Sequence, residues 1–128
     1  MSEGGAIVVV VDDDLSVRRG LERLLRSAGY RVETFASARD FLERGGNDRP
    51  GCAVLDVRMP GQSGFDLHDM LAAAGHDIPV IFITGDAELP MGDRATKAGA
   101  ADFLSKPFND DVLLSAVEQA VAKARRKS

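Results

Sequence analysis

Short apolar runs alternate with segments of helical periodicity along almost the whole chain. Runs of strand length occupy residues 7–11, 30–35, 52–55, 79–84 and 102–105. Continuous β-branched or apolar runs are typical of strands buried on both faces of a sheet, whereas the alternation across 30–35 is typical of a strand nearer an edge. The strict succession of strand and helix predicts an α/β fold, a doubly wound parallel sheet with helices on both faces.

The segments between these runs carry the signals of helices. Apolar residues recur at helical spacing across 17–28, and Gly29 stands where a C-terminal cap belongs. Further helices are predicted over 37–44, after Ser63, over 89–98 and after Asn109. Ser63 and Asp66 form a variant capping box, and the side chain of Asn109 caps the last helix. Strands and helices together make five strand–helix units.

The length and the charge of the chain restrict its class. A chain of 128 residues is interpreted as one domain, 1–128, with loose ends at 1–5 and 125–128. Its formal net charge of −4 argues against a general binder of nucleic acid or of a membrane surface, because such proteins usually carry a basic excess. Since no run approaches the ~20 apolar residues of a membrane span, we expect a cytoplasmic protein. Cys52 is interpreted as a small core residue, not as a reactive thiol.

Polar residues stand where four of the predicted strands end. Asp12 and Asp13 follow the first strand, and the other ends carry Asp56, Thr84 and Lys106. In a doubly wound sheet these ends border one ligand site, so we expect their side chains to converge. Three carboxylates cannot all stay ionised there without a counter-cation, and a site built from oxygen with few protein ligands suits Mg²⁺. A carboxylate can also act as a nucleophile toward a phosphoryl group, whose oxygens a metal, a lysine and a hydroxyl would neutralise.

Four motifs, in this order, resemble those of the response-regulator receiver domains of bacterial two-component systems. They are VVDDD at the first strand, LDVRMPGQSG around Asp56, PVIFITG at Thr84 and AGAADFLSKPF around Lys106. The resemblance covers essentially the whole chain, and DVRMPGQSG with ITGDAELPM is most similar to the FixJ-like subgroup. It implies a flavodoxin-like (βα)5 fold with five parallel strands in the order 2-1-3-4-5.

The resemblance also assigns roles to the acidic residues. Asp56 is the phosphoacceptor, and a sensor histidine kinase or a phosphotransfer protein is the donor. Asp13 and Asp56 are Mg²⁺ ligands, Asp12 holds a metal-bound water, and the backbone carbonyl of Arg58 is a further ligand. The chain is then a signalling receiver and not an enzyme, assisting only its own phosphorylation and dephosphorylation.

Further roles concern the phosphoryl group and its effect. Thr84 and Lys106 hold phosphoryl oxygens, and Thr84 with Phe103 switches the face built from the fourth helix, fifth strand and fifth helix. Phe103 lacks the hydroxyl of the tyrosine often found at its position. Arg58 and Asp86 stand where the family tunes the lifetime of the phosphoryl group. A homodimer that forms on phosphorylation is an expected partner state, whereas membrane contact and direct nucleic-acid binding are not.

Other residues receive structural interpretations. Asp14 begins the first helix, where the helix dipole favours a negative charge. Arg18 and Arg19 are interpreted as a solvated helix face. His68 and His76 are expected to be exposed.

Two other functions stay open at this point. DDDLS fits the D-x-D-x-[ST] signature of haloacid-dehalogenase-type phosphatases, with Asp12 as the nucleophile and Asp14 and Ser16 at the other positions. That interpretation leaves LDVRMPG and SKPF unexplained and lacks room for a substrate cap. The second is a receiver used as an interaction module without phosphorylation, which a failure to bind Mg²⁺ or beryllofluoride would favour.

Overall fold

The computed structural model describes residues 6–44, 50–59, 61–85, 100–106 and 108–127. Five parallel strands form one sheet, in the order β2-β1-β3-β4-β5. The strands are β1 (Ile7–Val11), β2 (Arg31–Phe35), β3 (Cys52–Asp56), β4 (Val80–Thr84) and β5 (Asp102–Ser105). The helices are α1 (Leu15–Ser27), α2 (Ala38–Leu42), α3 (Gly64–Ala73) and α5 (Asp110–Lys127). The predicted fold and strand order are confirmed, whereas the helix predicted over 89–98 lies outside the described residues.

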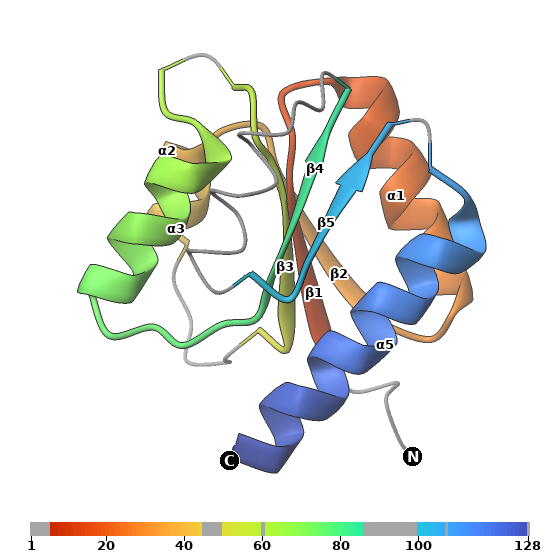
Figure 1. Cartoon of the computed structure of the whole chain (residues 1–128). Helices are drawn as coiled ribbons and strands as arrows, with labels where there is room; N and C mark the ends of the chain where they lie inside the picture. The colour runs from red at the N-terminus through yellow and green to blue at the C-terminus, as the bar shows by residue number, and fades with distance from the viewer. Residues whose placement is uncertain (1–5, 45–49, 60, 86–99, 107, 128) are drawn as a thin grey trace.

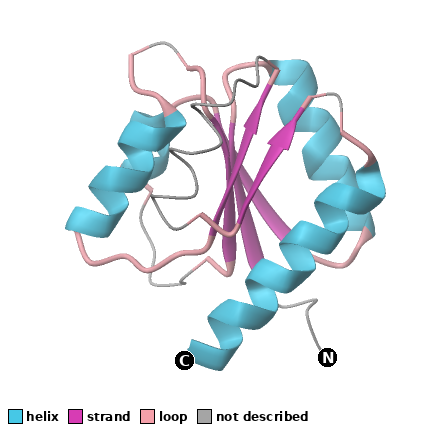
Figure 2. Cartoon of the chain, in the orientation of Figure 1, coloured by secondary structure: helices cyan, strands magenta, loops and turns pink. Residues whose placement is uncertain are grey.

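The sheet lies between two layers of helices, with α1 and α5 on one face and α2 and α3 on the other (Figure 1, Figure 2). Val8 and Val10 of β1 pack in the core on the α1 and α5 side, and Ile7, Val9 and Val11 pack in the core on the opposite side. Because successive strand residues point to opposite faces, the unbroken valine run fills both cores. No helix within the described ranges has the length and apolar character needed to cross a membrane.

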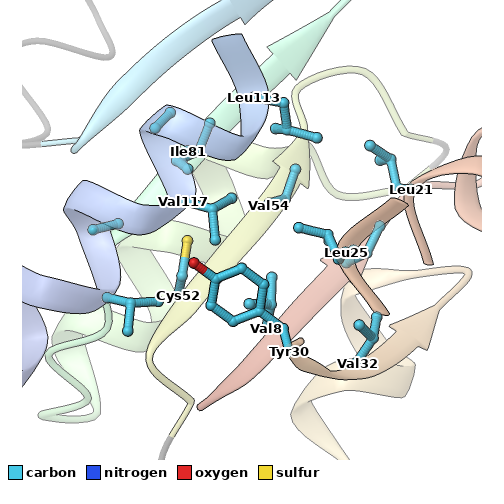
Figure 3. Packing of buried hydrophobic residues seen from close by; sticks show 14 of the residues in the cluster. Val8, Leu21, Leu25, Tyr30, Val32, Cys52, Val54, Ile81, Leu113 and Val117 are labelled. Carbon is cyan, nitrogen blue, oxygen red and sulfur yellow. The ribbon is translucent and has the colours of Figure 1, made fainter. Parts of the chain in front are cut away.

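The core beneath α1 and α5 holds the cysteine. Figure 3 shows Cys52 among the side chains of Tyr30, Val8 and Val117. The thiol is buried, and burial raises its pKa to about 12. Since the thiolate is the reactive form, this cysteine is inert at neutral pH, as its place in an apolar run predicted.

The ladders of the sheet continue for one residue past three strands. The backbone N–H of Asp12 donates to the carbonyl oxygen of Phe35 at 3.1 Å, and that of Lys106 donates to the carbonyl oxygen of Thr84 at 2.7 Å. The N–H of Val57 likewise donates to the carbonyl oxygen of Ile83 at 2.8 Å. Residues that follow the strands are therefore held at the carboxyl edge by the sheet itself.

The predicted ends of α1 and the predicted start of α3 are confirmed. Asp14 caps α1 by accepting hydrogen bonds from the backbone N–H groups of Ser16 and Val17. Ser63 and Asp66 form the reciprocal capping box at the start of α3. After α1 the chain turns at Gly29, whose φ of 97° is a conformation that favours glycine. The caps of α1 and α3 mark where the chain leaves the carboxyl edge of the sheet, whereas Gly29 precedes the start of β2 at the opposite edge.

Substitution of Gly64 tests how closely α3 packs against β3, the strand that carries Asp56. A Cβ atom on Gly64 would lie 2.5 Å from the backbone oxygen of Asp56, so the backbone would have to shift. We predict that Gly64→Ala lowers the free energy of unfolding by about 1–3 kcal/mol, measured by urea denaturation.

Gly20 provides the matched control for this substitution. It lies within α1, and a Cβ atom there would meet nothing within 4 Å. Gly20→Ala should raise the free energy of unfolding by about 0.5–1 kcal/mol, because alanine loses less backbone entropy in a helix. A Gly64→Ala variant that gains stability as Gly20→Ala does would contradict the close approach of α3 to β3.

Candidate functional site

Three carboxylates meet at the carboxyl edge of the sheet. Asp12 and Asp13 follow β1, and Asp56 ends β3, the strand that pairs with β1. One oxygen from each of these carboxylates lies within 4.8 Å of the other two. The structure therefore brings together the acidic residues that the sequence places at neighbouring strand ends.

Asp12 is completely buried, and all four of its polar groups have partners. Its backbone N–H is bound by Phe35, and its carbonyl oxygen accepts a hydrogen bond from Arg18 Nη1 at 2.8 Å. Its Oδ1 accepts from the backbone N–H of Asp14 at 2.9 Å, and its Oδ2 accepts from Lys106 Nζ at 3.0 Å. A buried carboxylate is stabilised only by such partners, so the position of Asp12 is fixed on every side.

Asp13 differs from Asp12 in its surroundings. Its side chain is exposed, and within the described ranges its carboxylate makes no hydrogen bond or ion pair. It therefore offers a carboxylate with open positions beside two carboxylates that are largely enclosed. A cation could reach this group from solvent.

Asp56 is 5% exposed, and its two oxygens differ in their surroundings. Oδ1 accepts a hydrogen bond from the backbone N–H of Arg58 at 3.3 Å, and Oδ2 lies 3.9 Å from Lys106 Nζ. Burial, and next the negative charge of Asp12, raise the pKa of Asp56 from 3.8 to about 6. The Lys106 charge and the Arg58 N–H act in the opposite direction. The carboxyl group thus holds its proton more tightly than an ordinary aspartate.

Lys106 lies between the two enclosed carboxylates. Its ammonium is nearer to Asp12, at 3.0 Å, than to Asp56, at 3.9 Å. The sequence placed Lys106 at this edge but gave no reason to expect Asp12 as its nearer partner. The ammonium can serve a group bound to Asp56 through a displacement of about an ångström, well within the freedom of a lysine side chain.

The remaining predicted residues lie along β4 and β5 or after β3. Thr84 is completely buried at the end of β4, where it pairs in register with Ser105. Phe103 is partly buried and packs against the core under α2 and α3. Arg58 is exposed beside Asp56, and Asp86 lies outside the described residues.

Two sequence interpretations are corrected by the structure. Arg18 was interpreted as part of a solvated helix face, but its guanidinium binds the backbone of Asp12. His68 was expected to be exposed, but it is partly buried, its ring centroid lies 5.8 Å from that of Phe82, and its Nδ1 is buried. Both residues border the apolar stripe of their helix, where a long or aromatic side chain reaches inward. His76 is exposed, as predicted.

The chemistry of this edge is that of oxygen ligands around a cation. Asp12, Asp13 and Asp56 supply carboxylates, and hard divalent cations prefer such oxygen ligands. Asp12 is poorly placed to act as a nucleophile, because both of its oxygens are engaged and its side chain has no exposure. Asp56 is better placed, since its Oδ2 lies beyond hydrogen-bond distance of Lys106.

Comparison with known protein families gives a match over most of the chain. Residues 8–118 match the model of the response regulator receiver domain. The match includes each strand-end residue discussed above, from Asp12 to Lys106.

Individual proteins give the same result. Nodulation protein W of Bradyrhizobium diazoefficiens is 52% identical over 122 residues, which are 95% of this chain and 54% of that protein. Transcriptional regulatory protein FixJ of Azorhizobium caulinodans is 44% identical over 91% of this chain and 56% of its own length. The crystal structure of FixJ-N superposes with a TM-score of 0.85 at 40% identity, covering 95% of this chain and 96% of that one. The chain thus spans a little over half the length of these curated relatives.

The raised pKa of Asp56 predicts how stability changes with pH in metal-free buffer. The native state binds this proton more tightly than the unfolded chain, so it loses stability as the pH rises from about 4 to about 6. Asp56→Asn stays neutral at every pH. The variant should therefore match the wild type near pH 4 and exceed its free energy of unfolding by about 1–3 kcal/mol near pH 7.5.

Urea denaturation in EDTA across this pH range measures the difference. Asp69→Asn is the control, because it removes an exposed carboxylate from α3 by the same change. Equal pH dependence in the two variants would contradict burial at the sheet edge as the cause.

Proposed function

The chain belongs to the response regulator receiver domain family, and we propose that Asp56 accepts the phosphoryl group and that 1–128 form one receiver domain. The observation that supports this proposal is the position of Asp56 beside a fully engaged carboxylate, Asp12, and an open one, Asp13. Lys106 lies 3.9 Å from Asp56 Oδ2, where it can pair with a group attached to that oxygen. The phosphoryl donor is a sensor histidine kinase or a phosphotransfer protein.

The same residues are proposed to hold Mg²⁺. Asp13 and Asp56 would bind the ion directly, together with the backbone carbonyl of Arg58, and Asp12 would bind it through a water. Mg²⁺ at this position supplies positive charge to the carboxylates and to the phosphoryl oxygens. Support comes from the donor set, which consists of oxygen atoms from few residues and includes the exposed carboxylate of Asp13.

Asp56 is proposed to act as a nucleophile in a direct displacement. A carboxylate oxygen forms a bond to phosphorus while the bond from phosphorus to the donor's imidazole nitrogen breaks, and the imidazole leaves. With a pKa of about 6, Asp56 is mainly ionised near pH 7.5, so the nucleophile is present without a separate base. The N–H of Arg58 orients Oδ1, and Lys106 neutralises charge on the transferred group.

The proposed output is a change in the face built around β5. Thr84 would hold a phosphoryl oxygen, and Phe103 would change its packing as Thr84 moves. Two arrangements of this face would exist, and the phosphoryl group would stabilise one of them. Support comes from the ladder, since the backbone N–H of Lys106 binds the carbonyl oxygen of Thr84 and so couples the two strand ends.

The partners of this face are also proposals. The chain spans a little over half the length of its curated relatives, so the output of the whole protein is itself a proposal. A homodimer that forms on phosphorylation is proposed as one response. The domain itself is proposed to act as a signalling receiver that catalyses only its own phosphorylation and dephosphorylation. Arg58 and Asp86 are proposed to set the lifetime of the phosphoryl group.

Labelling by acetyl phosphate with Mg²⁺ tests the acceptor. We predict an acid-labile and base-labile phosphoryl group, detected by mass spectrometry, that is absent from Asp56→Asn and present at a reduced rate in Asp12→Asn. Loss of the label in Asp12→Asn with full labelling of Asp56→Asn would support the phosphatase alternative. Failure of the wild type to bind beryllofluoride would support an interaction module without phosphorylation.

Mg²⁺ titration tests the metal ligands. Asp13→Asn should weaken Mg²⁺ binding by more than about 10-fold, because it removes a charged ligand that is open to solvent. Asp14→Asn is the control at the adjacent position, since Asp14 caps α1 and asparagine is an equally good cap. Isothermal titration calorimetry measures both variants, and equal loss of affinity in the two would contradict the assignment of Asp13.

A further inference from the structure

Arg18 binds the residue that precedes Asp13. Its guanidinium Nη1 donates to the carbonyl oxygen of Asp12 at 2.8 Å, whereas its backbone N–H makes the first main-chain bond of α1, to the carbonyl oxygen of Asp14 at 3.0 Å. Asp13 stands between these two residues in the sequence, and within the described ranges its exposed carboxylate makes no hydrogen bond or ion pair. The guanidinium thus holds the backbone directly before the residue with the open carboxylate.

The carbonyl group of Asp12 lies at a gap in the regular hydrogen bonding. β1 ends at Val11, and the first backbone hydrogen bond of α1 uses the carbonyl oxygen of Asp14. The carbonyl oxygen of Asp12 therefore belongs to neither the strand ladder nor the helix. Arg18 supplies its donor from the first turns of α1, and a charged donor makes this a strong bond.

Two possible roles of the Arg18 guanidinium, as a nearby positive charge or as a support for the backbone, predict opposite changes in cation affinity when it is removed. If the guanidinium acted only as a nearby positive charge, its removal would strengthen the binding of a cation at the acidic cluster. If it fixes the backbone, its removal would leave Asp13 in several arrangements and weaken that binding. The sign of the change in Mg²⁺ affinity therefore separates the two roles.

We propose that Arg18 is a positioning residue whose guanidinium fixes the backbone of Asp12, next to Asp13, and thereby sets the affinity of the acidic site for a divalent cation. This inference rests on the proposed function, since it assigns the cation to that site. The inference goes beyond the proposed function because it concerns Arg18, a residue of α1 that supplies no ligand to the cation.

Arg18→Gln and Arg19→Gln make a charge-matched pair, because Arg19 is the exposed neighbour on the same helix. Isothermal titration of the 128-residue chain with Mg²⁺ should show about 10-fold weaker binding in Arg18→Gln and wild-type binding in Arg19→Gln. Labelling by acetyl phosphate should require correspondingly more Mg²⁺ in Arg18→Gln and reach the wild-type rate at saturation. Equal or tighter binding in Arg18→Gln overturns the proposal.

A measurement without metal tests the positioning directly. In EDTA, the amide of Asp14, which donates to Asp12 Oδ1, should exchange its hydrogen faster in Arg18→Gln than in Arg19→Gln, whereas the amide of Val9 in the centre of β1 should not change. Unchanged exchange at Asp14 overturns the proposal. This measurement does not depend on Mg²⁺, so a wild type that binds no Mg²⁺ would contradict the proposed function separately.

The wild type provides a further test if Arg18→Gln does not fold. A guanidinium held by a hydrogen bond rotates slowly about its Cζ–Nη bonds, and NMR resolves this rotation. Arg18 should show slower rotation than Arg19 in the metal-free protein. Equal rotation in the two side chains overturns the proposal.

Discussion

The structure depends on the crowding of negative charge at one edge of a sheet that is otherwise apolar. Asp12 is completely buried and Asp56 is 5% exposed, so water contributes little to stabilising either charge. Lys106 and the backbone N–H of Asp14 bind the Asp12 carboxylate, whereas Asp56 has a weaker set of contacts and a pKa of about 6. Ionising Asp56 therefore destabilises the native state, and a cation bound at the site would offset this cost. The buried negative charge of Asp56 thus lowers the stability of the native state and also provides the group that is proposed to react.

The architecture confines that charge to one edge. A strand that is buried on both faces has to pass through two apolar cores, so its first polar residue stands where it leaves them. β1 and β3 both do this, and their pairing in register sets Val11 beside Leu55 and so brings Asp12 near Asp56. The absence of a side chain at Gly64 lets α3 begin directly against the backbone of Asp56. Apolar packing thereby decides the distances between groups whose own interactions are repulsive.

The sequence was sufficient to predict features that depend on local patterns. The valine run predicted both ends of β1, and Ser63 with Asp66 predicted the start of α3, because burial and capping act over a few residues. The nearer partner of Lys106 was not predicted, since it depends on differences of about an ångström between atoms 94 residues apart along the chain. Arg18 and His68 were assigned to exposed surfaces because each stands at the border of an apolar stripe, where spacing does not determine the direction of a side chain.

Three consecutive aspartates show how position alone separates identical side chains. Asp12 still belongs to the ladder through its N–H, Asp14 already belongs to the helix as its cap, and Asp13 belongs to neither. The first is therefore enclosed, the last is exposed but engaged by the helix, and the middle carboxylate is exposed and makes no hydrogen bond or ion pair within the described residues. To act as a nucleophile, the Asp12 carboxylate would first have to break its hydrogen bonds to Lys106 and to the Asp14 N–H. The Asp56 oxygen nearest Lys106 has no hydrogen bond to that lysine to break. The hydrogen bonds that connect strand to helix thus favour Asp56 over Asp12 as the proposed reacting carboxylate, and they leave the Asp13 carboxylate accessible to the proposed cation.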